Sequence, residues 1–289
     1  NPPSTAKCMS TWAIGLSTGC FYRQSIFDCL EPIRESGFSM IEVCFSPVHL
    51  DYHDLGIVRR ASSRIAELGM ETYSFHAPFA DDIDISSPDP HRRKSALEEI
   101  LRAAEAAAEL QVQYFVIHPG PEHSETKSGA EPYEGRQNVA ETLDQVAARC
   151  RALGIGCVLE NKLPHLLFGN ATDIVAILRA IAASGMGACL DTGHGFLSGD
   201  LLSLMKEIGP YVRMLHAHDN RGNGDDHRPP GDGGIDWISL LRGLAASQFK
   251  GAIILELAGE TTIEATLANA RSGRSYLRRL CRKLTFEES

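Results

Sequence analysis

Six apolar segments of the chain each end on a side chain that can bind a metal ion. Histidine ends three of them and a carboxylate ends the other three: TYSFH at His76, YFVIH at His118, GCVLE at Glu160, GACLD at Asp191, VRMLH at His216 and AIILE at Glu256. Imidazole nitrogens and carboxylate oxygens are ligands for divalent cations. If the segments are parallel strands of one barrel, their ends meet at the face where such barrels place their chemistry.

The three carboxylates form an acidic group that no strand-end Lys or Arg neutralises. A single Glu160 or Glu256 could cap a loop or pair with an arginine. Together with Asp191 near a barrel axis, however, they repel one another unless protons or cations compensate. A divalent metal ion is the simplest compensation, and the mixed oxygen and imidazole ligands leave Mn, Zn, Co and Mg open.

The stretch from 216 to 237, HAHDNRGNGDDHRPPGDGGIDW, is the densest in ligand-type residues, although such a polar loop could also be merely solvated. Strand alternation sends His216 and His218 to the same side, and we expect His218 to contact substrate or to orient a ligand. Asp191 and His194 occur in the string DTGH, where the alternative is that Asp191 only caps the next helix.

His76 and His118 follow adjacent predicted strands. A single strand-end histidine is more often a polar residue with satisfied hydrogen bonds than a ligand. Two of them at neighbouring positions favour contact with a metal ion or a substrate.

The elements that must position these residues alternate along the whole chain. Apolar runs predict parallel strands near 12–16, 39–44, 71–76, 113–118, 155–160, 187–191, 212–218 and 252–257. Helical patterns lie between them, near 25–36, 54–68, 91–110, 136–153, 171–184, 200–208, 236–246 and 261–283. We therefore predict an α/β protein, a single (β/α)₈ TIM barrel domain over residues 1–289. A doubly wound open sheet is the alternative, but no GxGxxG turn follows the first strand.

Composition limits the partners. The chain has 289 residues, of which 43% are hydrophobic and 22% charged, and its net charge is −9. This acidic balance argues against nucleic acid as a partner, since proteins that bind a DNA backbone usually carry a basic surface. No apolar stretch approaches the roughly 20 residues of a membrane span. The eight cysteines are scattered without a CxxC pair, which is typical of buried thiols in a reducing compartment, and we expect a cytoplasmic protein without membrane association.

The motifs together resemble a known superfamily. The strings FHAP, IHPG, VLEN, LDTGH, HAHDN, DDH, GDGGIDW and ILEL occur in the order found in xylose-isomerase-like TIM barrels. That superfamily includes sugar isomerases and epimerases, inosose dehydratases and the endonuclease IV group. The resemblance covers nearly the whole chain and is more specific for the superfamily than for one reaction.

The resemblance to the epimerase-type members implies one metal ion bound by Glu160, Asp191, His216 and Glu256. It also implies that the two glutamates act as the acid and base, while residues matching His194 and Arg221 contact the sugar. His76, His118 and His218 join them as expected substrate contacts. We expect a metal-dependent sugar or polyol isomerase or epimerase that transfers a proton through a metal-stabilised enediolate. Its partner would be a small sugar-like substrate, and a homo-oligomer is allowed.

The resemblance to the endonuclease IV group implies a different site, with three zinc ions and nine ligands. All nine have counterparts, because a second tier of five residues completes the set above: His76, His118, His194, Asp225 and His227. The alternative function is therefore an abasic-site phosphodiesterase. The flanking segments and the acidic charge are more similar to the sugar-converting members. A non-catalytic sugar-binding barrel is a third hypothesis, against which Glu160 and Glu256 argue.

Overall fold

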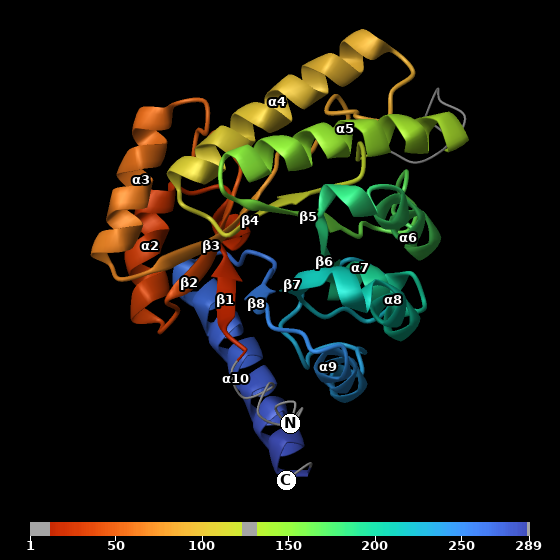
Figure 1. Cartoon of the computed structure of the whole chain (residues 1–289). Coiled ribbons are helices and arrows are strands. Elements are labelled where there is room, and N and C mark those ends of the chain that lie inside the picture. Colours follow the sequence, from red (N-terminus) through yellow and green to blue (C-terminus); the bar gives the residue numbers. More distant parts are fainter. Residues whose placement is uncertain (1–11, 123–131, 288–289) are drawn as a thin grey trace, which may run out of the picture.

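The computed structural model describes residues 12–122 and 132–287, and in it the predicted strands close into one parallel barrel (Figure 1). The strands pair in chain order, and the last pairs with the first. Their bounds are β1 Ile14–Ser17, β2 Met40–Cys44, β3 Glu71–His76, β4 Tyr114–Ile117, β5 Gly156–Glu160, β6 Gly187–Asp191, β7 Val212–Ala217 and β8 Ala252–Leu255. The fold is therefore a (β/α)₈ TIM barrel, as predicted.

Helices surround the barrel (Figure 1). They are α2 Ile26–Glu35, α3 Leu55–Glu67, α4 Pro90–Glu109, α5 Pro132–Ala152, α6 Ala171–Ala180, α7 Thr192–Leu197, α8 Leu201–Ile208, α9 Trp237–Ala246 and α10 Ile263–Glu287. Short 3₁₀ helices lie at η1 Thr18–Phe21, η3 Ala182–Ser184 and η4 Gly209–Tyr211. None of the helices in the described part of the chain is long and apolar enough to cross a membrane.

Two local predictions need correction. The helix expected over 171–184 is α6 followed by the separate turn η3, because the chain leaves α-helical geometry at Ile181. The sequence pattern also missed α7, which begins directly after β6. Asp191 is the N-cap of α7 and accepts a hydrogen bond from the His194 amide at 2.7 Å. Such a short helix has too few turns to show an apolar period.

The barrel interior has an apolar layer below a layer of titratable groups. One buried cluster consists of strand residues only and fills the lumen: Tyr73, Val116, Val158, Cys189, Met214, Ala252 and Ile254. Since side chains alternate along a strand, the residue two positions later points into the lumen one layer higher. The pairs formed in this way are Val116 and His118, Val158 and Glu160, Cys189 and Asp191, Met214 and His216, and Ile254 and Glu256. The pleat of the strands thus brings these five candidate ligands to the C-terminal mouth.

Candidate active site

The C-terminal mouth holds a group of four candidate ligands. One side-chain atom from each of Glu160, Asp191, His216 and Glu256 lies within 4.8 Å of the others. His216 Nδ1 is 3.1 Å from Glu160 Oε1 and 3.3 Å from Glu256 Oε2. Neither His216 Nδ1 nor Glu256 Oε2 has a hydrogen-bond partner, although both atoms are buried. Buried polar atoms are normally satisfied, so a cation between them fits this group.

A second group shares Glu160 with the first. It combines His76, Glu160 and His216 within the same distance limit. Glu160 Oε2 is 3.1 Å from His76 Nε2 and 3.5 Å from His118 Nε2, whereas Oε1 faces His216. The two oxygens of one carboxylate therefore point to different sets of imidazoles, which is an arrangement suited to bridging two cations.

The third group combines one residue of α7 with three residues that follow β7. It consists of His194, His218, Asp225 and His227. Asp225 Oδ2 lies 3.3 Å from His194 Nε2 and 3.1 Å from His227 Nε2. His218 stacks on His227 at 3.8 Å between ring centroids. Asp225 Oδ1 and His218 Nδ1 are buried without hydrogen-bond partners, so this group also fits a cation.

Backbone carbonyls orient three of the imidazoles. His76 Nδ1 faces the Ala77 carbonyl at 2.8 Å, His194 Nδ1 the Asn161 carbonyl at 3.0 Å, and His227 Nδ1 the Glu256 carbonyl at 2.9 Å. A carbonyl can only accept, so Nδ1 donates its proton there. Nε2 then donates to the carboxylates when the ring is protonated, and in the neutral ring its lone pair can bind a cation, which is how metal-binding histidines are usually held.

The carboxylates of the C-terminal mouth stabilise positive charge on the groups around them. Burial opposes protonation of His76, but the hydrogen bond and the charge of Glu160 outweigh burial and raise its pKa to about 9. Burial likewise opposes the charge of His194, and the carboxylates of Asp191 and Asp225 raise its pKa to about 10. For Glu160, burial raises the pKa, but the nearby histidines outweigh it and hold that pKa well below the ordinary value. Without a metal ion, protons on these histidines supply the positive charge that a bound cation would otherwise supply.

The sequence analysis missed several groups around the mouth. Glu42 on β2 is fully buried and lies 2.8 Å from His216 Nε2. Glu122 lies 2.7 Å from His118 Nδ1, and the buried Lys162 donates hydrogen bonds to the Gly120 and Pro121 carbonyls beside it. A charged residue inside an apolar run, as in MIEVC, was the available signal for Glu42.

Arg221 and His218, two expected substrate contacts, line neither of the two cavities at the C-terminal mouth. Arg221 is exposed and lines none of the described cavities. His218 is fully buried, and its Nε2 lies 3.0 Å from Asp191 Oδ2. Asp191 therefore both caps α7 and holds an imidazole. Of the other expected contacts, His76, His118 and His194 line cavities at the mouth.

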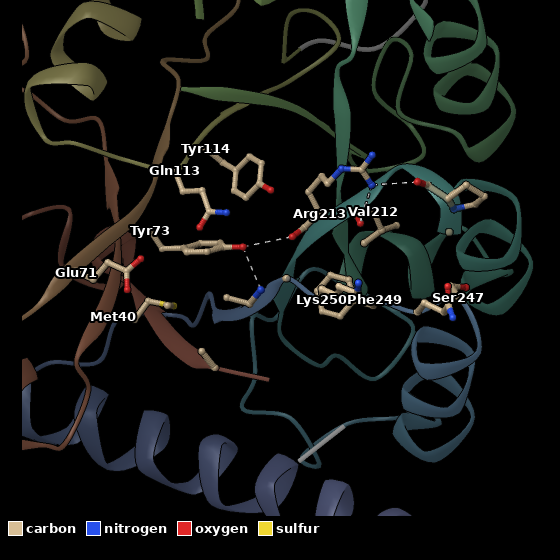
Figure 2. Close-up of a pocket in the computed structure, with 16 residues that line it drawn as sticks. Met40, Glu71, Tyr73, Gln113, Tyr114, Val212, Arg213, Ser247, Phe249 and Lys250 are labelled. Atoms are coloured by element: carbon tan, nitrogen blue, oxygen red, sulfur yellow. Dashed lines mark hydrogen bonds between the residues drawn. The ribbon is translucent and has the colours of Figure 1, made fainter. Parts of the chain in front are cut away.

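Two adjoining cavities open at the C-terminal mouth, with volumes of about 370 and 280 Å³. They share five wall residues: His76, Phe79, Asp225, His227 and Glu256. A larger cavity of about 590 Å³ lies at the opposite mouth, where Tyr73, Tyr114, Arg213 and Lys250 surround it (Figure 2). None of the clustered ligands lines that larger cavity, so size does not locate the chemistry.

Comparisons with known proteins agree with this geometry. The profile of the xylose isomerase-like TIM barrel family matches residues 30–280. The ketose 3-epimerase of Arthrobacter globiformis is 28% identical over 83% of this chain and 80% of its own. A probable endonuclease 4 of Nitratidesulfovibrio vulgaris, strain Hildenborough, is 30% identical over 76% of this chain and 80% of its own. The crystal structure of a D-tagatose 3-epimerase-like protein superposes with a TM-score of 0.78 at 24% identity, covering 92% of this chain and 98% of that one.

Proposed function

The chain belongs to the xylose isomerase-like TIM barrel family, and on that premise we propose that it is a divalent-metal-dependent isomerase or epimerase of a free sugar or polyol. The observation that carries the proposal is the position of two glutamates around one candidate cation site. Glu160 ends β5 and Glu256 follows β8, so β6 and β7 separate them. Both belong to the four-residue group, and both line a cavity of small-molecule size.

The four-residue group of Glu160, Asp191, His216 and Glu256 would hold the cation. When bound, a divalent ion supplies a Lewis acid that stabilises the enediolate formed when a proton leaves a carbon next to a carbonyl. Glu256 borders both cavities and its side chain is 22% exposed, so its carboxylate can accept a proton from a substrate carbon. Glu160 is buried and lines the smaller cavity. Once its carboxyl group carries a proton, it can return that proton to the carbon, which leaves Glu160 ionised and Glu256 protonated.

The wall of the 370 Å³ cavity at the C-terminal mouth favours an uncharged substrate. Four carboxylates line it, from Glu42, Asp225, Asp226 and Glu256, and they outnumber the two imidazoles, from His76 and His227. None of its described wall residues is Lys or Arg. A phosphate dianion would meet repulsion there, while hydroxyl groups could donate hydrogen bonds to the carboxylates.

An aromatic wall completes this cavity. Phe45 and Phe79 lie edge to face at 5.0 Å between ring centroids, and Tyr22 also lines the cavity. Aromatic rings offer apolar surface to the C–H face of a sugar. The substrate class that fits is thus an unphosphorylated ketose, aldose or polyol derivative.

Deuterium exchange tests this function. The metal-loaded enzyme would be incubated in D₂O with free ketoses, aldoses and inososes, and with their phosphates, while NMR follows new isomers and carbon-bound deuterium. We expect conversion of one or more free sugars, with little or none of the matched phosphate. An epimerase that shields its proton would yield the new isomer without deuterium. If no sugar is converted, the proposal is wrong.

A second candidate function is abasic-site phosphodiesterase activity, and a specific observation favours it. The three ligand groups contain all nine counterparts of the three-zinc site once His118 is counted beside Glu160. Abasic duplex DNA in the same experiment separates the two functions. Metal-dependent strand cleavage without sugar conversion, together with about three zinc ions per chain, would assign the nuclease.

A further inference from the structure

Glu42 is a buried carboxylate with an unusual position. It lies in the middle of β2, fully buried, in a segment that is otherwise apolar. Parallel pairing puts Ser17 of β1 and Ser74 of β3 beside it on either side. The β2–β3 register shifts between Ile41 and Glu42, and this irregularity brings Ser74 opposite the glutamate.

Three donors satisfy the Glu42 carboxylate. Ser17 Oγ donates to Oε1 at 3.0 Å, and Ser74 Oγ donates to Oε2 at 2.7 Å. The third donor is His216 Nε2, which lies 2.8 Å from Oε2. Burying a carboxylate is costly unless it is paired and hydrogen-bonded, so these contacts explain how the charge is tolerated at this depth. They also show that both carboxylate oxygens already accept hydrogen bonds from the protein. Glu42 belongs to none of the three candidate ligand groups.

His216 is held differently from the other imidazoles of the mouth. His76, His194 and His227 donate from Nδ1 to backbone carbonyls and turn Nε2 towards the carboxylates. His216 is reversed, since its Nε2 faces Glu42 and its Nδ1 faces Glu160 and Glu256. A carboxylate that accepts from one ring nitrogen fixes the tautomer and makes the other nitrogen a stronger ligand.

We propose that Glu42 is a positioning residue that fixes His216 in the Nε2–H tautomer, so that Nδ1 is the metal-binding atom. Ser17 and Ser74 hold the glutamate in place for this role. The inference rests on the cation site of the proposed function. It predicts that the cation affinity of the mouth depends on a residue that does not touch the cation.

The experiment uses Co²⁺ as the probe and compares Glu42→Gln with the parent protein. The amide can still accept a hydrogen bond but carries no charge, and its NH₂ group conflicts with the donors around it. We expect Co²⁺ affinity, measured by competition with a chelator, to fall about 10- to 100-fold. Glu71→Gln is the matched control, because Glu71 lies on the neighbouring strand and is exposed at the other mouth. It should bind Co²⁺ like the parent.

A second readout does not depend on the metal. Nitrogen-15 NMR of the imidazoles in the metal-free protein, at a pH where His216 is neutral, should show the Nε2–H tautomer for His216 in the parent and a mixture in Glu42→Gln. Glu42→Asp keeps the charge but withdraws it by one methylene group, and we expect an intermediate affinity. It takes the place of Glu42→Gln should that variant not fold.

Unchanged Co²⁺ affinity and an unchanged tautomer in a folded Glu42 variant would overturn the inference while leaving the cation site intact. A parent protein that binds no Co²⁺ would overturn both this inference and the proposed function. A parent that binds Co²⁺ but converts no sugar would contradict the proposed function alone.

Discussion

The two mouths of the barrel differ in whether their buried polar groups have hydrogen-bond partners. At the N-terminal mouth, Tyr73 OH accepts from the Ala252 amide at 3.1 Å, and Arg213 donates to the Pro210 carbonyl at 3.0 Å. At the C-terminal mouth, His216 Nδ1, Asp225 Oδ1 and Glu256 Oε2 are buried without partners. The first mouth has the larger cavity, and the second has the unsatisfied ligands.

Buried polar atoms without hydrogen-bond partners therefore locate the candidate active site better than cavity size does. A protein tolerates buried groups without partners when something absent from the polypeptide completes them. Asp219 provides the contrast inside the C-terminal mouth itself. It accepts from the amides of Asn220, Gly231 and Ile235 and from Trp237 Nε1, so it holds the loop after β7 and needs no cation.

The same substitution at the two mouths should give the largest contrast. Glu256→Gln removes a proposed ligand and proton acceptor, and we expect roughly a 10³-fold loss of sugar conversion together with weaker metal binding. Glu71→Gln makes the same chemical change at the N-terminal mouth and should leave both properties unchanged. Steady-state kinetics and metal titration of both variants measure this. A Glu256→Gln protein that binds metal as tightly as the parent would remove Glu256 from the ligand set.

Removal of the cation from the C-terminal mouth should lower the stability of the folded protein. A cation present at 100 times its Kd adds about 2.7 kcal/mol to the free energy of unfolding, because it binds only the folded state. For a chain of this size we expect Tm to fall by roughly 5–10 °C on chelation. Thermal unfolding with and without EDTA measures the shift, and added metal should restore Tm and activity. Equal Tm values would show that no bound cation stabilises the fold.

The metal-free protein should lose stability as the pH rises. The pKa values of His76 and His227 are raised to about 9 in the folded state, from ordinary values near 6.5. Their contribution is fully present below pH 6.5 and is lost as the pH rises through about 9. We expect Tm of the apo-protein to fall by roughly 5 °C over this window. Metal-loaded protein should show a smaller fall, since the cation replaces the protons. A Tm that rises over the window would contradict the charge balance described here.

Substitution of Arg213 should have the smallest effect. It is an exposed residue of the larger cavity at the N-terminal mouth, and Arg213→Ala removes a contact to the Pro210 carbonyl (Figure 2). We expect a change of about 0.5 kcal/mol or less in the free energy of unfolding and no change in sugar conversion. Chemical denaturation and activity assays test this expectation. A large loss of activity would place the active site at the N-terminal mouth instead of the C-terminal one.

The sequence predicted the barrel well because period-2 and period-3.6 patterns alternate clearly along it. It also identified residues that the structure brings together, since a His, Asp or Glu after an apolar run is easy to recognise. It could not find Glu42 as a partner of His216, because 174 residues separate them and only barrel closure makes them neighbours. The exposure of Arg221 and the burial of His218 likewise depend on the course of one loop, which no local period encodes.

Anomalous diffraction from crystals loaded with Zn²⁺ would place each cation in the molecule. We expect a strong peak coordinated by Glu160, Asp191, His216 through Nδ1, and Glu256, at the C-terminal mouth. We expect no peak in the cavity of the N-terminal mouth. Absence of a peak among these four residues in a crystal that contains zinc would show that they do not form a cation site.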